Sequence, residues 1–161
     1  FDDQGSLASK GKIHSDLIGQ FIKDFYFSKP PPKSLERKDL FENKYLEEIY
    51  HLDSYDCLAT LSALTTKTLE IGIQFLPKKP KNIIIVGGGQ KNKYLIQLIK
   101  KANLSPNILI GEEVGLDSDY IEAELIAFLA ARKYHNLPST FPTTTGVKQE
   151  TILGNLIKYV V

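Results

Sequence analysis

A run of four β-branched residues followed by three glycines constrains the fold of this chain more than any other feature. Residues 83–86, Ile-Ile-Ile-Val, have the length and type expected of a strand that is buried on both faces. Gly87, Gly88 and Gly89 end the strand, and apolar residues then recur with a helical period over 94–99. The sequence therefore predicts a strand, a glycine turn and a helix in direct succession.

The glycine turn has two interpretations. Glycines carry no Cβ, so their backbone N–H groups can come close to a ligand, and the following helix points its partly positive N-terminus at the same place. Phosphate or a nucleotide would suit such a site. Alternatively, the glycines only form a tight connection, because short glycine motifs often occur without a ligand. The pattern alone leaves both interpretations open.

Length and composition exclude several classes of protein. With 161 residues, 42% of them hydrophobic, the chain is long enough for one domain, or for one lobe of something larger. The 20 basic and 19 acidic residues are mixed along the chain, which argues against nucleic acid as the main partner. Cys57 is the only cysteine, so we expect no disulfide, no cysteine-based metal site and a reducing, cytoplasmic setting. No apolar run approaches the roughly 18 residues needed to cross a membrane.

Hydrophobic periodicity predicts a mixed α/β order of elements. We expect helices over 13–25, 40–52, 53–76, 94–103 and 117–134, and strands over 83–86 and 107–110. A strand, a helix and a strand in that order imply a right-handed parallel crossover. Asp117, Ser118 and Asp119 are expected to cap the last helix.

The segment Pro30-Pro-Pro32 is followed by charged residues and also has two interpretations. The one we favour is a rigid linker whose charges are solvated. The other is a stiff loop that presents Lys33, Ser34 and Arg37 to an anionic ligand.

Glu122 is a candidate for a special role because of its position on the last helix. At about 100° per residue, it falls between the apolar residues Leu129 and Ile126, whereas Glu124 falls at the edge of that sector. A buried, unpaired carboxylate costs several kcal/mol, so we expect it to be paired, protonated or directed into a site. A structural bond, to Arg132 or to a neighbouring helix end, and a functional role both fit the pattern.

Most recognisable catalytic motifs are absent. His14, His51 and His135 lack a second ligand at metal-binding spacing, so we expect no metal site formed by this chain. We find no nucleophile turn of the Gly-x-Ser-x-Gly type and no Gly-x-x-x-x-Gly-Lys-Ser/Thr phosphate loop. Of the parts that phosphoryl transfer needs, the sequence offers at most the nucleoside end.

Taken together, several segments resemble one family. They are residues 5–12, Pro30 to Ser34 with Arg37, residues 56–61 with 64–65, Val86 to Gly89 with Asn92, residues 115–117, residues 121–123 leading to 128–130, and 137–138 through 145–146. In this order they are similar to the C-terminal portion of the anhydro-N-acetylmuramic acid kinases, and they cover nearly the whole chain.

The resemblance implies a fold and a reaction. The chain would be the C-terminal, nucleotide-binding, ribonuclease H-like lobe (1–161) of the sugar kinase, actin and heat-shock ATPase superfold. Residues 1–52 would form a helical and proline-rich peripheral segment, and the N-terminal lobe would be absent. The family uses ATP and Mg²⁺ to open the 1,6-anhydro ring and phosphorylate O6, giving N-acetylmuramic acid 6-phosphate for peptidoglycan recycling.

The resemblance also implies roles for particular residues. Gly87, Gly88, Gly89 and Asn92 match the motif on the adenosine side, and Glu122 matches a glutamate near the sugar. The family's phosphate motif and the segment with its catalytic aspartate have no counterpart here, so Mg²⁺ ligands are expected from the missing N-terminal part. We therefore expect no kinase turnover from this chain alone. Leu35-Glu36 replaces the family's Thr-Gly, which weakens any sugar-side role for the proline loop.

Two other functions fit the residues. One is a Rossmann-type dinucleotide-binding domain, for which Glu112 or Glu113 would end the second strand, although Asn92 stands where a third glycine would help packing. The other is a non-catalytic half of a split or degraded kinase. The sequence leaves the oligomeric state open, a homodimer included.

Overall fold

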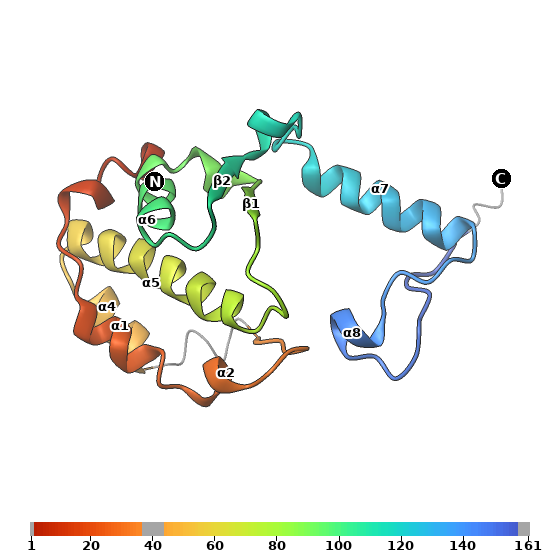
Figure 1. The fold of residues 1–161 in the computed structure, drawn as a ribbon, viewed down its shortest axis with the longest axis horizontal. Helices are drawn as coiled ribbons and strands as arrows, with labels where there is room; N and C mark the ends of the chain where they lie inside the picture. Colours follow the sequence, from red (N-terminus) through yellow and green to blue (C-terminus); the bar gives the residue numbers. More distant parts are fainter. Residues whose placement is uncertain (1, 37–43, 158–161) are drawn as a thin grey trace.

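The computed structural model describes residues 2–36 and 44–157. Figure 1 shows a helical body that carries a small sheet, and an arm that extends from it. We call residues 2–36 and 44–120 the body, and residues 121–157 the arm. Arg37, one of the candidate anion contacts, lies outside the described residues.

The described residues form short 3₁₀ turns, helices and two strands. In chain order they are η1 (Asp3–Gly5), η2 (Ala8–Lys10), α1 (Ser15–Phe21), α2 (Phe25–Ser28), α4 (Lys44–Tyr50), α5 (Ser54–Gln74), β1 (Asn82–Ile85), η3 (Gly88–Lys91), α6 (Lys93–Lys101), β2 (Asn107–Ile110), η4 (Gly111–Val114), α7 (Ile121–Tyr134) and α8 (Pro142–Thr145).

The centre of the body is α5, the longest helix in the described part of the chain. It starts where the sequence predicts, because the Asp53 side chain accepts hydrogen bonds from the backbone N–H groups of Tyr55 and Asp56. Helices α1, α4 and α6 pack against α5. The main cluster of buried apolar side chains consists of Ile18, Phe21, Phe27, Leu46, Ile49 and Leu64. Residues 1–52 thus supply five of these six core side chains, and their place at the periphery of a complete kinase stays a prediction.

The first predicted helix is wrong in one respect, because it is divided into α1 and α2. The Asp24 side chain accepts a hydrogen bond of 2.8 Å from the Tyr26 N–H and so begins a new helix. Aspartate competes for backbone donors in this way and favours helix starts over helix interiors.

The strand, helix and strand unit is present as predicted. Strands β1 and β2 pair in parallel, with Ile85 opposite Ile110, and α6 connects them. This arrangement confirms the α/β class, whereas a two-stranded sheet does not show a ribonuclease H-like lobe. The expectation that β1 is buried on both faces is wrong, since Ile84 is 45% and Val86 38% exposed. The described chain therefore covers these two side chains only in part.

The arm differs from its prediction in two ways. Helix α7 begins after Tyr120 without a side-chain cap, because the Asp117 carboxylate accepts instead from the Asp119 N–H, at 3.0 Å. In addition, none of its residues is buried. After α7 the chain forms α8 and a single antiparallel bridge between Thr140 and Thr151. Across the described residues, no helix is long and apolar enough to span a membrane.

Candidate functional site

The glycine corner, Gly87 to Gly89, follows the end of β1. Its three positions differ in whether the backbone requires glycine. Gly87 has φ +73° and ψ −169°, a combination that is essentially restricted to glycine. Gly88 and Gly89 do not have positive φ. A Cβ added to either of them would meet nothing within 4 Å. The backbone at Gly88 and Gly89 is therefore open to the outside, and nothing in the fold requires glycine there.

Asn92 follows the corner and fixes the start of α6. Its side-chain oxygen accepts a hydrogen bond of 2.9 Å from the Leu95 N–H. The same oxygen lies against Gly5, where an added Cβ would collide with it. In this structure Asn92 therefore acts as a helix cap that also contacts the N-terminal turn. Its expected contact with a nucleotide stays a prediction.

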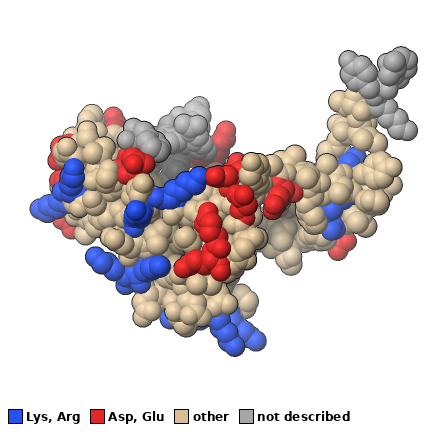
Figure 2. Space-filling model, turned by 90° about the horizontal axis from the view of Figure 1, so that it is seen from above, with Lys and Arg blue, Asp and Glu red and all other residues tan. Residues whose placement is uncertain are grey.

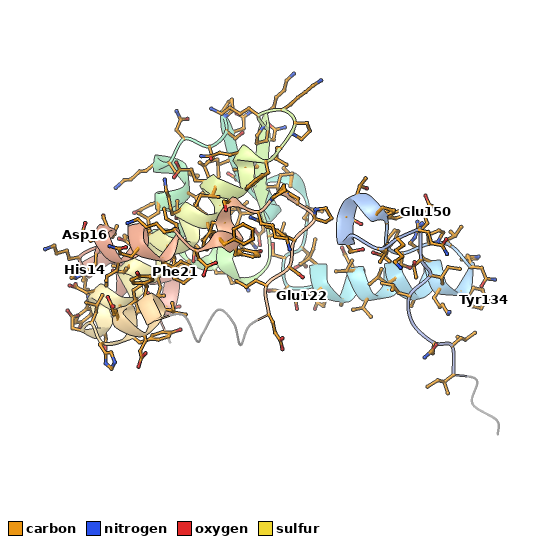
Figure 3. All side chains as sticks on the ribbon, turned by 90° about the horizontal axis from the view of Figure 1, so that it is seen from below. His14, Asp16, Phe21, Glu122, Tyr134 and Glu150 are labelled. Carbon is orange, nitrogen blue, oxygen red and sulfur yellow. The ribbon has the colours of Figure 1, made fainter. Side chains whose placement is uncertain are left out.

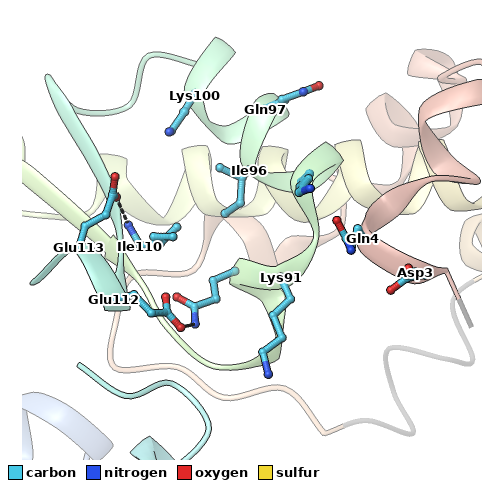
Figure 4. A pocket seen from close by; sticks show the side chains of 11 residues that line it. Asp3, Gln4, Lys91, Ile96, Gln97, Lys100, Ile110, Glu112 and Glu113 are labelled. Atoms are coloured by element: carbon cyan, nitrogen blue, oxygen red, sulfur yellow. Dashed lines mark hydrogen bonds between the residues drawn. The ribbon is translucent and has the colours of Figure 1, made fainter. Parts of the chain in front are cut away.

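A hollow of about 670 Å³ lies beside the corner. It is lined by Asp3, Gln4, Gln90, Lys91, Lys93, Ile96, Gln97, Lys100, Ile110, Glu112 and Glu113. Figure 4 shows one wall formed by Ile110, Glu112 and Glu113, and an opposite wall formed by Asp3 and Gln4. The three glycines are not among the lining residues, so the corner reaches the hollow through the two residues that follow them.

The hollow has charges of both signs. Three lysines and three carboxylates line it, and on the face in Figure 2 acidic and basic groups lie next to one another. Lys91 forms an ion pair with Asp119. The hydrogen bond that Lys91 donates to Asp119, together with the charge of that carboxylate, raises the pKa of Lys91, and Glu112 contributes a smaller effect in the same direction. The hollow therefore suits a ligand with several polar groups better than a purely apolar one.

Gln90 connects the ends of the two strands. Its side chain is 7% exposed, accepts a hydrogen bond of 3.0 Å from the Gly111 N–H, and donates one of 2.5 Å to Glu112 Oε1. Sequence reasoning missed this link. The sequence hints at the link between Gln90 and Glu112 only through the two acids after the second strand. Those acids were considered for the Rossmann alternative alone.

Glu122 does not lie where the helical pattern predicts. It is exposed, in the first turn of α7, and is not among the residues that line the hollow. Figure 3 shows it where the arm begins. The expectation of a buried carboxylate is wrong because the helix face around it is open, with Leu125 and Ile126 exposed and Ile121 and Leu129 only half-buried. Its role near the sugar stays a prediction.

Lys33 has a structural role rather than the anion-binding role considered for the proline segment. Its ammonium group donates to the carbonyl oxygens of Tyr26 and Phe27, at 2.9 and 3.3 Å. It also lies 4.6 Å from the ring centres of Tyr26 and Phe75. The charge is neither fully solvated nor free for a ligand, because it holds the C-terminal end of α2.

The described residues contain no group of three or more His, Cys, Asp or Glu side chains that could hold a metal ion. His14 instead pairs with Asp56, at 2.9 Å, and the Asp56 carboxylate also accepts from the Lys12 N–H, at 2.7 Å. These bonds hold the N-terminal segment on the start of α5.

Comparison with known proteins identifies the family. The model of the anhydro-N-acetylmuramic acid kinase family matches residues 1–159. A kinase of that name from Zymomonas mobilis is 36% identical over 99% of this chain and 42% of its own length. Kinases of the same name from a Cyanothece species and from Caldanaerobacter subterraneus are 37% and 32% identical, over 99% and 97% of this chain and 43% and 41% of their own lengths.

The chain thus spans well under half the length of these relatives. The comparisons do not confirm the expectation that it corresponds to their C-terminal portion. Because the family model matches residues 1–159, the chain belongs to the anhydro-N-acetylmuramic acid kinase family.

Proposed function

We propose that this chain forms the nucleoside-binding side of an ATP-dependent anhydro-N-acetylmuramic acid kinase. In this proposal the complete enzyme hydrolyses the 1,6-anhydro ring and phosphorylates O6, which gives N-acetylmuramic acid 6-phosphate in cell-wall recycling. Family membership supports the kinase activity. Because the chain spans under half of each relative's length, the activity and both substrates belong to the proposal.

The observation that carries the proposal is the open backbone at Gly88 and Gly89. A tight connection needs glycine only at Gly87, where φ is positive. We infer that the two further glycines allow a ligand to approach the main chain closely. Ligands of open α/β sheets bind outside the carboxyl ends of the strands, and the corner and the hollow are at that end of β1 and β2.

The rest of the reaction needs groups that the described residues do not bring together. Bound Mg²⁺ would neutralise charge on the transferred phosphoryl group, and it is usually held by one or two carboxylates together with the substrate phosphates. We place its ligands, and the base that activates water, in parts of the kinase outside this chain. A partner lobe, a homodimer and a cytoplasmic location also stay predictions.

Family membership favours the kinase over the Rossmann alternative. The structure adds a physical reason, because Asn92 begins α6 as a side-chain cap at the position where a third Rossmann glycine would help packing.

Calorimetric titration of ATP tests the proposal on the full chain. The double variant Gly88→Ala/Gly89→Ala adds two methyl groups that meet no other part of the fold. We expect it to bind ATP at least about tenfold more weakly than the wild type, with the same melting temperature. The control is Gly72→Ala on α5, whose added methyl also meets nothing and should leave ATP binding unchanged.

Unchanged ATP affinity in the double variant would show that the corner is only a tight connection. An assay of product formation tests the proposed division of roles separately. The pure 161-residue chain should show no turnover with ATP and the anhydro sugar, and measurable phosphorylation would contradict this division.

A further inference from the structure

Glu112 is a carboxylate of the hollow that is held by a buried side chain. Gln90, which holds it, is fixed at both ends of its amide group, since the amide oxygen accepts from the Gly111 N–H and the amide nitrogen donates to Glu112 Oε1. With Gln90 only 7% exposed, the glutamine has little freedom to turn. Glu112 is therefore positioned by a buried side chain, although its own side chain is exposed.

The chemistry of Glu112 differs from that of the neighbouring acid. Glu113 Oε2 accepts a hydrogen bond of 2.7 Å from the Ile110 N–H, so that carboxylate closes the turn after β2. Glu112 makes no such bond to the backbone, and Gln90 uses only one of its two oxygens. An ionised carboxylate is purely an acceptor, and its natural partner in a ligand is a group that donates, such as a hydroxyl.

The position of Glu112 relative to the corner suits a ligand that spans both strand ends. In the parallel register Ile85 lies opposite Ile110, so the residues after them leave the sheet at the same edge. The corner follows the first strand and Glu112 follows the second. In dinucleotide-binding α/β proteins an acid at the end of the second strand accepts from ribose hydroxyls, and Glu112 likewise follows the second strand here.

We propose that Glu112 is a specificity-determining residue that accepts a hydrogen bond from a ribose hydroxyl of the bound nucleotide, with Gln90 as its positioning residue. The inference rests on the proposed function, because it assumes that a nucleotide occupies the corner and the hollow. It predicts that the chain distinguishes ribonucleotides from deoxyribonucleotides. A hydrogen bond to a charged group supports a preference of about tenfold.

The experiment compares the dissociation constants of ATP, 2′-deoxy-ATP and 3′-deoxy-ATP for the full chain. The wild type should bind ATP about tenfold more tightly than at least one of the deoxy analogues. Glu112→Ala should bind ATP and that analogue equally, with affinity for the analogue unchanged. The control is Glu124→Ala, which removes an exposed carboxylate from α7 and should leave the preference intact.

The outcomes separate the two proposals. If the wild type binds ATP but does not distinguish it from either analogue, or if Glu112→Ala keeps the full preference, the inference is wrong and the proposed function stands. If the wild type does not bind ATP, the proposed function fails and the inference fails with it. The wild-type comparison needs no variant, so a loss of stability in Glu112→Ala cannot obscure the result.

Discussion

Helices α5 and α7 are both rich in apolar residues, but only α5 is part of a core. Helix α5 buries Ala59 and Leu64 among helices of the body, whereas α7 buries no residue. In the arm, the exposed fractions of Leu125, Ile126 and Phe128 are 55%, 65% and 56%. An apolar helical pattern therefore predicts a helix, whereas burial of that helix also requires a surface that faces it.

A helix without tertiary packing depends on local interactions. Helices shorter than about 12–15 residues are marginal in water on their own, and α7 has 14. Its C-terminal end is supported by Arg132, whose Nε donates to the Pro138 carbonyl oxygen and whose guanidinium group lies 5.4 Å from the centre of the Phe128 ring. We therefore expect the body to determine global stability and the arm to respond locally.

The largest difference should come from truncating one isoleucine in each region. Ile49 is fully buried in the core cluster, so Ile49→Ala should lower the free energy of unfolding by about 2–5 kcal/mol through lost contacts and a cavity. Ile126 is 65% exposed on α7, so Ile126→Ala should change it by less than about 0.5 kcal/mol. Urea unfolding followed by circular dichroism measures both values.

Equal losses for the two variants would contradict the comparison. That result would mean that Ile126 is covered in solution, so the oligomeric state of both variants should be measured alongside by sedimentation.

The body and the arm each contain a glycine with positive φ that allows the two regions to be tested through the backbone. Gly87 in the body has a conformation that essentially only glycine adopts, so Gly87→Ala should cost about 1–3 kcal/mol of global stability. Gly146 in the arm has φ +74° and ψ +16°, a left-handed conformation that costs other residues about 1–2 kcal/mol. Because the arm is not part of the core, that cost should not appear in the global transition.

Urea midpoints with unchanged slopes distinguish these outcomes. The control is Gly88→Ala, which needs no unusual backbone angle and should leave the midpoint where it is in the wild type. A lower midpoint for Gly146→Ala than for Gly87→Ala would reverse the ranking of the two regions. It would also indicate that the close approach of Gly146 to Pro32, whose Cγ would lie 3.2 Å from a Cβ added at position 146, ties the arm to the body.

A smaller effect is expected from weakening each helix by one alanine. A glycine in a helix interior costs about 1 kcal/mol relative to alanine. In α5, Ala63→Gly should shift the global unfolding transition by about that amount, since Ala63 packs against the core. In α7, Ala127→Gly should leave the transition in place and speed amide hydrogen exchange within α7 alone. Peptide-resolved exchange at several urea concentrations separates local from global opening.

The wild type is the internal control for this measurement. Its α7 amides should already exchange by local opening, with less protection than those of α5. Protection of α7 equal to that of α5 in the wild type would show that the arm unfolds together with the body.

Short-range patterns account for the parts of the fold that were predicted correctly. Strand β2 has the predicted bounds, Asn107–Ile110, and α5 begins at Ser54, one residue after the predicted start at 53. Each of these features depends on a few consecutive residues. The break between α1 and α2 was not predicted, because the apolar period continues across Asp24 and hides the competing hydrogen bond of its side chain.

The candidate site was harder to predict because its contacts connect distant residues. Gln90 and Glu112 are 22 positions apart, and only the parallel register brings them together. Glu122 shares a helix face with apolar residues, but helical periodicity does not show whether another element packs against that face. For Asn92 the sequence indicated a ligand contact. The structure shows a local cap on Leu95 and a contact with the distant Gly5.

The smallest expected effect concerns a carboxylate that ties the N-terminal segment to the body. The backbone hydrogen bond from Lys12 and the bond from His14 lower the pKa of Asp56 below its ordinary value of 3.8. Because the folded-state pKa is the lower one, this contribution to stability is complete above about pH 3.8 and is lost as pH falls through the folded-state value. Asp56→Asn should therefore melt at a slightly lower temperature than the wild type at pH 6.

The difference between Asp56→Asn and the wild type should shrink below pH 3.8, because protonation removes the charge from the wild type as well. Melting curves from pH 6 down to pH 2.5 follow it. Glu150→Gln is the matched control in the arm, where the exposed carboxylate should make no difference at any pH. A difference in melting temperature that stays constant with pH would mean that the asparagine weakens the body by altered hydrogen bonding. In that case the charge of Asp56 contributes nothing to holding the N-terminal segment on α5.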